Sequence, residues 1–262
     1  MRITTLSKPI VSGNVVILPV KNPEGGKIVI NGVEAKPENV VKYDARVDIM
    51  DPTTKKRCFI IEHVLGPLRM LGVTDAIVLG LDKTWNFLRP EHRFAYSLGL
   101  TPEVVVGRED GKQRPKLEEI IDSVRLKTDK EFYVTVAQEV YFKTIDIFGH
   151  RGEITIAPLP PESGIVLNIE LFKNSIEDIR LGENGLEDKH LAKKILDART
   201  PFLIGIENEE ALFHAIGDVI ADIVGLGRLT DAKIDVKLNF FYHSLTVGAI
   251  KRAKIIRREV FQ

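Results

Sequence analysis

The chain has 262 residues and carries 37 basic and 37 acidic side chains, so its formal net charge is zero. This balance gives no electrostatic reason to expect binding to nucleic acid or to an anionic membrane. The single cysteine, Cys58, excludes an intrachain disulfide and any zinc site built from several cysteines. Because no apolar run is long enough to span a bilayer and no secretory signal opens the chain, we expect a cytoplasmic protein without a transmembrane segment.

The first part of the chain reads as short strands interrupted by helices. Strands are expected at 14–20, 26–30, 46–49, 57–61, 74–81 and 103–106. The Asn31-Gly32 pair is typical of a hairpin turn. The apolar strand at 57–61 leads directly into a helix over 62–72, and Gly72 is its expected C-terminal stop. A further helix is expected at 85–98.

The second part repeats this alternation after a charged segment that contains Gly and Pro. Residues 108–116 have the composition of a linker, and we place the linker itself at 113–130. Strands are then expected at 131–142, 152–158, 164–172, 202–206 and 231–241, and helices at 186–198, 210–222 and 244–256.

An internal repeat indicates how these elements are grouped. Residues 71–78 and 227–234 share a Thr-Asp-Ala sequence, and each segment follows a helix that carries a histidine. The pattern predicts an α+β fold with two similar domains, 1–112 and 131–262, joined by the linker 113–130. Each domain would lay helices on one face of a mainly antiparallel sheet. The helices of the two domains would pack together at the interface, where pockets often lie.

The helix expected at 210–222 carries a stripe of polar side chains on an otherwise apolar surface. Glu210, His214, Asp218 and Asp222 recur every four residues, a spacing that places them along one side of the helix. The remaining surface is so apolar that the helix should be buried, and buried carboxylates are rare unless they are paired or bind a metal. Imidazole and carboxylate are ordinary zinc ligands.

His63 supplies a third candidate ligand from the first half of the chain. The helical stripe then offers two ligand sets. In the first, Glu210 and His214 bind the metal, and Asp218 lies next to the ligands without binding the metal. In the second, His214 and Asp218 bind the metal, and Asp222 takes that neighbouring position. Spacing alone does not separate these two sets. Three protein ligands leave one position for water, as in catalytic zinc sites, and iron(II) is compatible with the same ligands.

Other polar residues are placed where they could serve such a centre. Glu62, next to His63, is a candidate general base. His243 stands where a strand gives way to a helix, and an aspartate behind the metal could keep it protonated. Thr200, taken alone, reads as a turn residue before Pro201.

Several of these segments resemble motifs of the UDP-3-O-acyl-N-acetylglucosamine deacetylases, the zinc amidases of lipid A biosynthesis. Ile61-Glu62-His63 is similar to the family's Val-Glu-His motif, which opens a helix. Ala215-Ile216-Gly217-Asp218 resembles the end of the family's zinc-helix motif. The segment 198–202, Ala-Arg-Thr-Pro-Phe, resembles its Ala-Arg-Thr-Phe segment, and His243 its late catalytic histidine. The matches occur in the same order over nearly the whole chain.

The resemblance implies an activity and a set of site residues. The implied zinc ligands are His63, Glu210 and His214. The implied catalytic residues are Glu62 as general base, His243 as general acid or oxyanion partner, Asp218 as the group that keeps His243 protonated, and Thr200 as an oxyanion contact. The implied reaction is removal of an acetyl group from UDP-3-O-acyl-N-acetylglucosamine or from a smaller N-acetyl sugar. The ligand set with Asp218 on the metal stays open.

The chain also departs from the family pattern. The long insert that shapes the family's acyl-chain passage is replaced here by residues 202–209, and Ala211 stands where the family has a lysine. With these departures the chain resembles a divergent member of the family. The departures also motivate an alternative, a catalytically inactive protein that binds a metal or another ligand on the same scaffold. The oligomeric state is not predicted.

Overall fold

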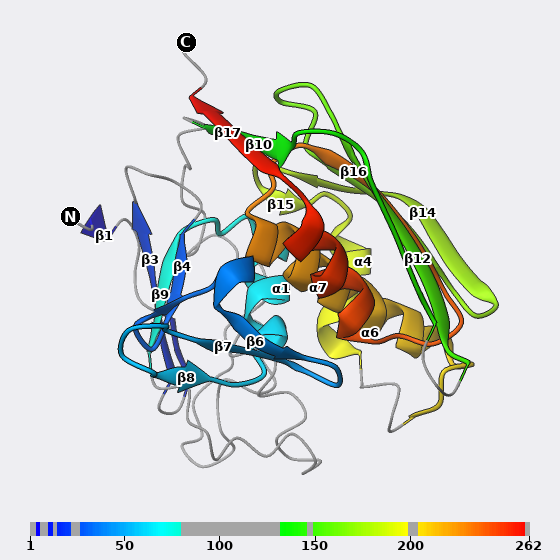
Figure 1. The fold of residues 1–262 in the computed structure, drawn as a ribbon, viewed down its shortest axis with the longest axis horizontal. Coiled ribbons are helices and arrows are strands. Elements are labelled where there is room, and N and C mark those ends of the chain that lie inside the picture. Colours follow the sequence, from blue (N-terminus) through cyan, green and yellow to red (C-terminus); the bar gives the residue numbers. More distant parts are fainter. Residues whose placement is uncertain are drawn as a thin grey trace.

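The computed structural model describes residues 4–5, 10–12, 15–21, 27–79, 132–145, 149–198 and 204–259. Over these ranges the protein has the expected α+β fold, with its helices packed between β-sheets (Figure 1). None of the helices in these ranges is long and apolar enough to cross a membrane. The helix expected at 85–98, the strand at 103–106 and the linker at 113–130 lie outside the described residues, so both domain boundaries stay predictions.

The described part of the first half contains two small sheets and one α-helix. Its strands are β1 (Thr4–Thr5), β2 (Ile10–Ser12), β3 (Val15–Lys21), β4 (Ile28–Ile30), β5 (Val33–Glu34), β6 (Val40–Tyr43), β7 (Val47–Met50), β8 (Arg57–Cys58) and β9 (Ala76–Leu79). One sheet has the order β1-β3-β9-β4-β5, with β2 paired to β3, and the other has the order β6-β7-β8. Helix α1 (Glu62–Met70) follows β8, and a short 3₁₀ turn, η1 (Pro37–Asn39), precedes β6.

The second half contains the larger sheet, a two-stranded ribbon and the remaining helices. Its strands are β10 (Phe132–Val136), β11 (Val140–Ile145), β12 (Arg151–Pro158), β13 (Ile165–Leu171), β14 (Asn174–Gly182), β15 (Gly185–Leu186), β16 (Ala232–Leu238) and β17 (Ile255–Glu259). The sheet order is β11-β12-β16-β13-β14-β15, and β10 pairs with β17. The helices are α4 (Lys189–Asp197), α6 (Glu209–Val219), its π-helical continuation η4 (Ile220–Gly225), and α7 (His243–Arg252).

The Thr-Asp-Ala repeat builds the same structure in both halves. In each half the repeat opens a strand that pairs in parallel with an earlier strand, β9 with β4 and β16 with β13. Asp75 accepts a hydrogen bond from the backbone N–H of Lys27 at 2.9 Å, and Asp231 accepts one from that of Gly164 at 2.9 Å. The threonine before each aspartate donates to its other carboxylate oxygen. Each aspartate therefore fixes the start of the neighbouring strand, which supports the predicted internal repeat.

The turn before each repeat is left-handed at the same position. Gly72 has φ of +79°, and Arg228, its counterpart, has φ of +55°. A Cβ at Gly72 would lie 2.8 Å from backbone atoms of Glu183 and Asn184, so the close approach of a neighbouring loop requires glycine there. At the second turn the Arg228 side chain instead reaches across to Glu34 in the first half.

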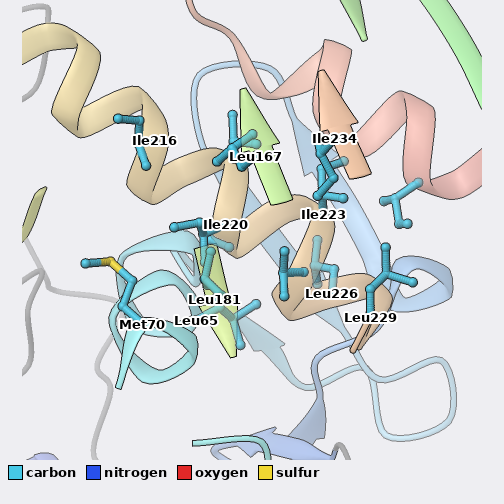
Figure 2. Packing of buried hydrophobic residues seen from close by; sticks show 14 of the residues in the cluster. Leu65, Met70, Leu167, Leu181, Ile216, Ile220, Ile223, Leu226, Leu229 and Ile234 are labelled. Atoms are coloured by element: carbon cyan, nitrogen blue, oxygen red, sulfur yellow. The ribbon is translucent and has the colours of Figure 1, made fainter. Parts of the chain in front are cut away.

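A single hydrophobic core joins the two halves. Leu65 on α1 and Ile220 on η4 are both fully buried, and Figure 2 shows them beside Leu181 of β14. Leu167 and Ile234, from the parallel pair β13 and β16, continue the same cluster and are also fully buried (Figure 2). Because the core is shared, burial of apolar surface holds the helices of both halves against one another.

Helix α1 approaches α6 closely because glycines stand at the crossing. A Cβ at Gly66 would lie 2.6 Å from the backbone carbonyl oxygen of Gly217. Further along the same contact, a Cβ at Gly225 would lie 3.1 Å from the Cβ of Leu65. The absence of side chains at these points lets the two helix backbones come together.

The hairpin turn and most of the expected strands lie where the sequence predicts them, but four of the expected elements differ. Asn31 and Gly32 join β4 and β5 with positive φ values of 47° and 85°, as this turn type requires. The strand expected at 57–61 ends at Cys58, and the one at 131–142 is split into β10 and β11. Residues 204–206 contain no strand, and the helix expected at 244–256 ends at Arg252.

Candidate metal centre

Helices α1 and α6 bring three metal-ligating side chains together. One ligand atom from each of His63, His214 and Asp218 lies within 4.8 Å of the others. His214 Nε2 is 3.2 Å from one Asp218 oxygen, and His63 Nε2 is 4.0 Å from the other. The two imidazole rings meet edge to face with centroids 5.4 Å apart. This is the only such group among the residues that the structure describes.

The crossing of the two helices explains why these residues meet. His63 lies one turn before Gly66 on α1, and Asp218 follows Gly217 on α6. The contact between the two glycines therefore brings the first turn of α1 close to the last turn of α6, just before η4. His214, four residues before Asp218, lies on the same side of α6.

The carboxylate that the structure places in this group is that of Asp218, whereas the family resemblance implies Glu210. Glu210 is not a member of the group. It lies in the first turn of α6, where its backbone N–H is capped by the side chain of Asn208. Asp218 lies two turns further along and is only 4% exposed, against the α1 crossing. The geometry thus corresponds to the second of the two ligand sets that the sequence leaves open.

Glu62 lies beside the group and is held in a defined orientation. Its side chain is buried, with the whole residue 2% exposed. One carboxylate oxygen accepts a hydrogen bond from the Val47 backbone N–H at 3.0 Å, and the other lies 3.8 Å from His243 Nε2. Burial raises the pKa of Glu62 to about 8; His243 opposes this rise and the Asp218 carboxylate adds to it.

A strained turn places Glu62 and His63 at the start of α1. Ile60 is a buried β-branched residue with φ of +55°, a conformation that such residues rarely adopt. Its backbone N–H donates to Asp48 at 3.3 Å, and the next N–H, of Ile61, donates to the Val47 carbonyl. Strand β7 thus holds the turn at successive positions, and its Val47 also binds Glu62.

His243 opens α7 and is held by an aspartate from η4. His243 Nδ1 and Asp222 Oδ2 are 2.7 Å apart, and the Thr246 hydroxyl donates to the same oxygen at 2.6 Å. Burial acts to lower the pKa of His243, but the surrounding carboxylates, Asp222 foremost, raise it to about 10. His243 is therefore protonated at neutral pH and donates from Nδ1 to Asp222.

The aspartate that binds His243 differs from the one implied by the resemblance. Asp218 was expected in this role, but it is 3.9 Å from His243 Nε2 and belongs to the metal group. Asp222 lies one turn later, in the π-helical segment η4, and is fully buried. A π-helical segment widens the helix locally and is frequent at functional sites. Here the segment carries the aspartate that faces α7.

Protonation in the group suits a divalent cation. Burial lowers the pKa of His63 to about 3, against the attraction of the Asp218 carboxylate, so the imidazole is neutral. Burial acts to raise the pKa of Asp218, but the neighbouring histidines, His214 foremost, outweigh it and lower the pKa to about 2. Two nitrogen donors and one ionised oxygen donor are the chemistry that zinc or iron(II) accepts.

Two further residues of the site bear on the sequence-based prediction. Thr200 lies outside the described residues, so its predicted oxyanion contact stays a prediction. Thr246, which binds both Asp222 and the His243 carbonyl, was not anticipated. It lies three residues after His243, one turn along a helix, and that spacing was the only signal for it in the sequence.

A small cavity opens beside the metal group. Its volume is about 40 Å³. Glu62, His63, His214 and Asp218 contribute to one part of its lining. The other described residues of the lining are apolar: Pro67, Met70, Ile195, Leu196, Ala198 and Gly217. The cavity therefore runs from the metal group into a space between α1, α4 and α6.

Comparison of the sequence with family models and with curated proteins identifies no relative. No family model matches the chain, and no curated protein sequence matches it. The resemblance to the zinc deacetylases thus rests on the short motifs alone, and the function has to be inferred from the site.

Proposed function

We propose that the protein is a metal-dependent amidohydrolase that removes the acetyl group from an N-acetylated sugar. The observation that carries the proposal is the convergence of three groups of different chemistry in one buried place. A His-His-Asp set faces a buried carboxylate, Glu62, and a protonated imidazole, His243. A structural metal site would need neither of the last two groups.

His63, His214 and Asp218 would hold the cation. Zinc supplies a Lewis acid that lowers the pKa of water and polarises a carbonyl group. With three protein ligands, one coordination position is left for water or substrate. Iron(II) fits the same donors.

Glu62 is placed to act as the general base. Because Val47 occupies one carboxylate oxygen, the other is directed toward the centre, on the side of His243. In the proposed reaction this oxygen accepts a proton from the attacking water, which requires the ionised form of Glu62. A cation bound beside Glu62 would favour that form and lower its pKa from about 8. Fixing the carboxylate in advance avoids the cost of orienting it during the reaction.

His243 is placed to serve the opposite end of the reacting amide. Its Nδ1 is occupied by Asp222, so Nε2 carries the proton that faces Glu62 and Asp218. That N–H can stabilise the developing oxyanion or give its proton to the leaving amine. A contact from Thr200 is part of the proposal on the strength of the motif resemblance alone.

The motif resemblance also suggests which substrates to test. UDP-3-O-acyl-N-acetylglucosamine comes first, and a smaller N-acetyl sugar comes second because residues 202–209 replace the insert that forms the family's acyl passage. Hydrolysis of either would yield acetate and a free amine. We expect the protein to act in the cytoplasm.

The proposed role of Glu62 gives a direct test. Glu62→Gln replaces the basic carboxylate by an amide of nearly the same size and shape. Turnover of an N-acetyl sugar should therefore fall by about 10²–10⁴-fold. Zinc content, measured by elemental analysis, should stay that of the wild type. Glu209→Gln, an exposed change on α6, is the matched control and should leave both unchanged.

Two outcomes would count against this proposal. Unchanged turnover in Glu62→Gln would remove Glu62 from the mechanism. Binding of N-acetyl sugars without zinc-dependent cleavage of any of them would favour the alternative of an inactive binding protein.

A further inference from the structure

We propose that the cavity between α1, α4 and α6 is the binding site for the acyl group of the substrate and restricts it to short chains. This inference rests on the proposed function and deepens it, because it assigns the two sides of the amide to different parts of the site. The acyl side enters the cavity, and the sugar stays on the outer side.

The position of the cavity ties it to the reacting carbonyl. The cavity shares His63, His214 and Asp218 with the metal group and also reaches Glu62. A carbonyl carbon at this group must therefore have one of its substituents in or next to the cavity. Since an amide is planar and its acyl and nitrogen substituents point apart, only one of them can enter.

The size of the cavity decides which substituent enters. A volume of about 40 Å³ corresponds to roughly three water molecules, at 10–15 Å³ for each. An acetyl methyl group fits this space and a two- or three-carbon extension fills it. A sugar ring, which has more than ten heavy atoms with its hydroxyl groups, does not fit.

The apolar side chains that line the cavity also favour binding of the acyl group over binding of the sugar. Met70 is 1% exposed, Ile195 and Leu196 are 6% exposed, and none of the three offers a hydrogen-bonding group. Sugar hydroxyls placed against them would lose their hydrogen bonds to water without replacement. An alkyl chain makes no hydrogen bonds to water that could be lost, and its burial in the cavity is favourable because apolar surface is removed from water.

Gly217 and Leu196 set the dimensions of the cavity. A Cβ at Gly217 would lie 3.1 Å from Ile195 Cγ2, so even a methyl group there would narrow the space between α6 and α4. Truncation of Leu196 on α4 would widen it from the other side. The two changes should therefore shift the preferred chain length in opposite directions.

Hydrolysis of a series of N-acyl glucosamines tests this assignment. The series carries acetyl, butanoyl and hexanoyl groups, and the readout is the ratio of kcat/KM for the longer chains to that for acetyl. In the wild type we expect a steep fall toward hexanoyl. Leu196→Ala should raise the hexanoyl ratio by about tenfold or more, and Gly217→Ala should lower the butanoyl ratio, since each methylene in an apolar pocket is worth about 10–200-fold.

A control on the same helix separates cavity effects from loss of stability. Leu191→Ala removes a partly buried side chain of α4 that does not line the cavity, so it should leave the ratios at their wild-type values. If Leu196→Ala and Leu191→Ala give the same ratios, the cavity does not bind the acyl group, although the hydrolase proposal would stand.

A binding measurement decides the matter without turnover. Straight-chain hydroxamic acids coordinate zinc through the hydroxamate and present an alkyl chain like that of the acyl group. Acetohydroxamate should raise the Tm of the zinc-loaded wild type more than hexanohydroxamate does, and Leu196→Ala should remove this difference. Equal shifts for both acids in the wild type would overturn the inference, whether or not any sugar amide is cleaved.

Discussion

At the scale of single residues, the site depends on a conformation that its sequence disfavours. A β-branched residue at positive φ, such as Ile60, costs on the order of 1–3 kcal/mol and persists only where neighbouring contacts enforce it. The enforcing contact is Asp48, whose fully buried carboxylate accepts the Ile60 N–H and pairs with Arg46 and Arg57 at 3.0 Å each. The ion pairs keep this carboxylate in place under the turn that presents Glu62.

We therefore expect Asp48→Ala to destabilise the turn at Ile60. The change leaves Arg46 and Arg57 without their shared partner and should lower the free energy of unfolding by about 1–3 kcal/mol. It should also slow turnover through misplacement of Glu62. Urea unfolding measures the first effect. Glu170→Ala removes an exposed carboxylate paired with one lysine and should cost less than about 1 kcal/mol. Similar losses in both variants would contradict a special role for Asp48.

The sequence singles out residues that the structure brings together, but it does not decide between Glu210 and Asp218. His214 was singled out because polar groups in apolar surroundings need a partner. Glu62, His63 and His243 were singled out because they stand where a strand gives way to a helix. The structure brings these four side chains together. The choice between Glu210 and Asp218 was not accessible, since both lie one turn from His214. It depends on where α1 crosses α6, which is a property of the packed helices.

At the scale of elements, the crossing of α1 and α6 is the feature that assembles the site. We expect Gly66→Ala to force the helices apart, because the added Cβ would meet the Gly217 carbonyl oxygen at 2.6 Å. The strain should lower the free energy of unfolding by about 1–3 kcal/mol, despite the higher helix propensity of alanine. It should also weaken zinc binding, because the two histidines come from different helices.

Gly182→Ala is the matched control for this change. A Cβ there would lie 3.4 Å from a Glu187 side-chain oxygen, in ordinary contact with a flexible group. Urea unfolding and zinc titration of both variants are the measurements. If Gly66→Ala were as stable as wild type and bound zinc equally well, the close crossing would not be what positions the ligands.

Elements that the sequence misassigned were decided by tertiary contacts. Strand β14 was missed because most of its residues, in Asn174–Gly182, are polar and only two of them are buried. Its pairing with β13 therefore leaves little apolar pattern in the sequence. The strand expected at 57–61 stops at Cys58 because Asp48 draws the next residues into a turn. The helix expected at 244–256 ends at Arg252. The residues that follow, Ile255–Glu259, form strand β17, which pairs with β10.

At the scale of the whole molecule, polar contacts between the halves supplement the shared core. Glu34 in β5 pairs with Arg228, whose left-handed turn belongs to the second half. Burial acts to raise the pKa of Glu34, but Arg228, with Lys27 and Lys36, outweighs it and holds the pKa below its ordinary value. The pair therefore stabilises the folded protein when Glu34 is ionised.

The sign of this shift predicts a loss of stability in acid. A lowered pKa contributes stability above the ordinary pKa of glutamate, and that contribution is lost as the pH falls through the pKa of the folded state. Glu34→Gln should thus be less stable than wild type at neutral pH by about 1 kcal/mol. The difference should vanish in acid, as measured by urea unfolding across the pH range. A difference that persisted unchanged in acid would show that the Glu34 charge is not its source.

The central claim is that two distant helices share one cation through His63, His214 and Asp218. Elemental analysis of purified wild type beside His63→Ala, Asp218→Ala and Glu210→Ala tests it most directly. We predict about one zinc or iron per chain in the wild type and in Glu210→Ala, and a loss of metal in the other two variants. Equal metal content in wild type, His63→Ala and Asp218→Ala would contradict the claim.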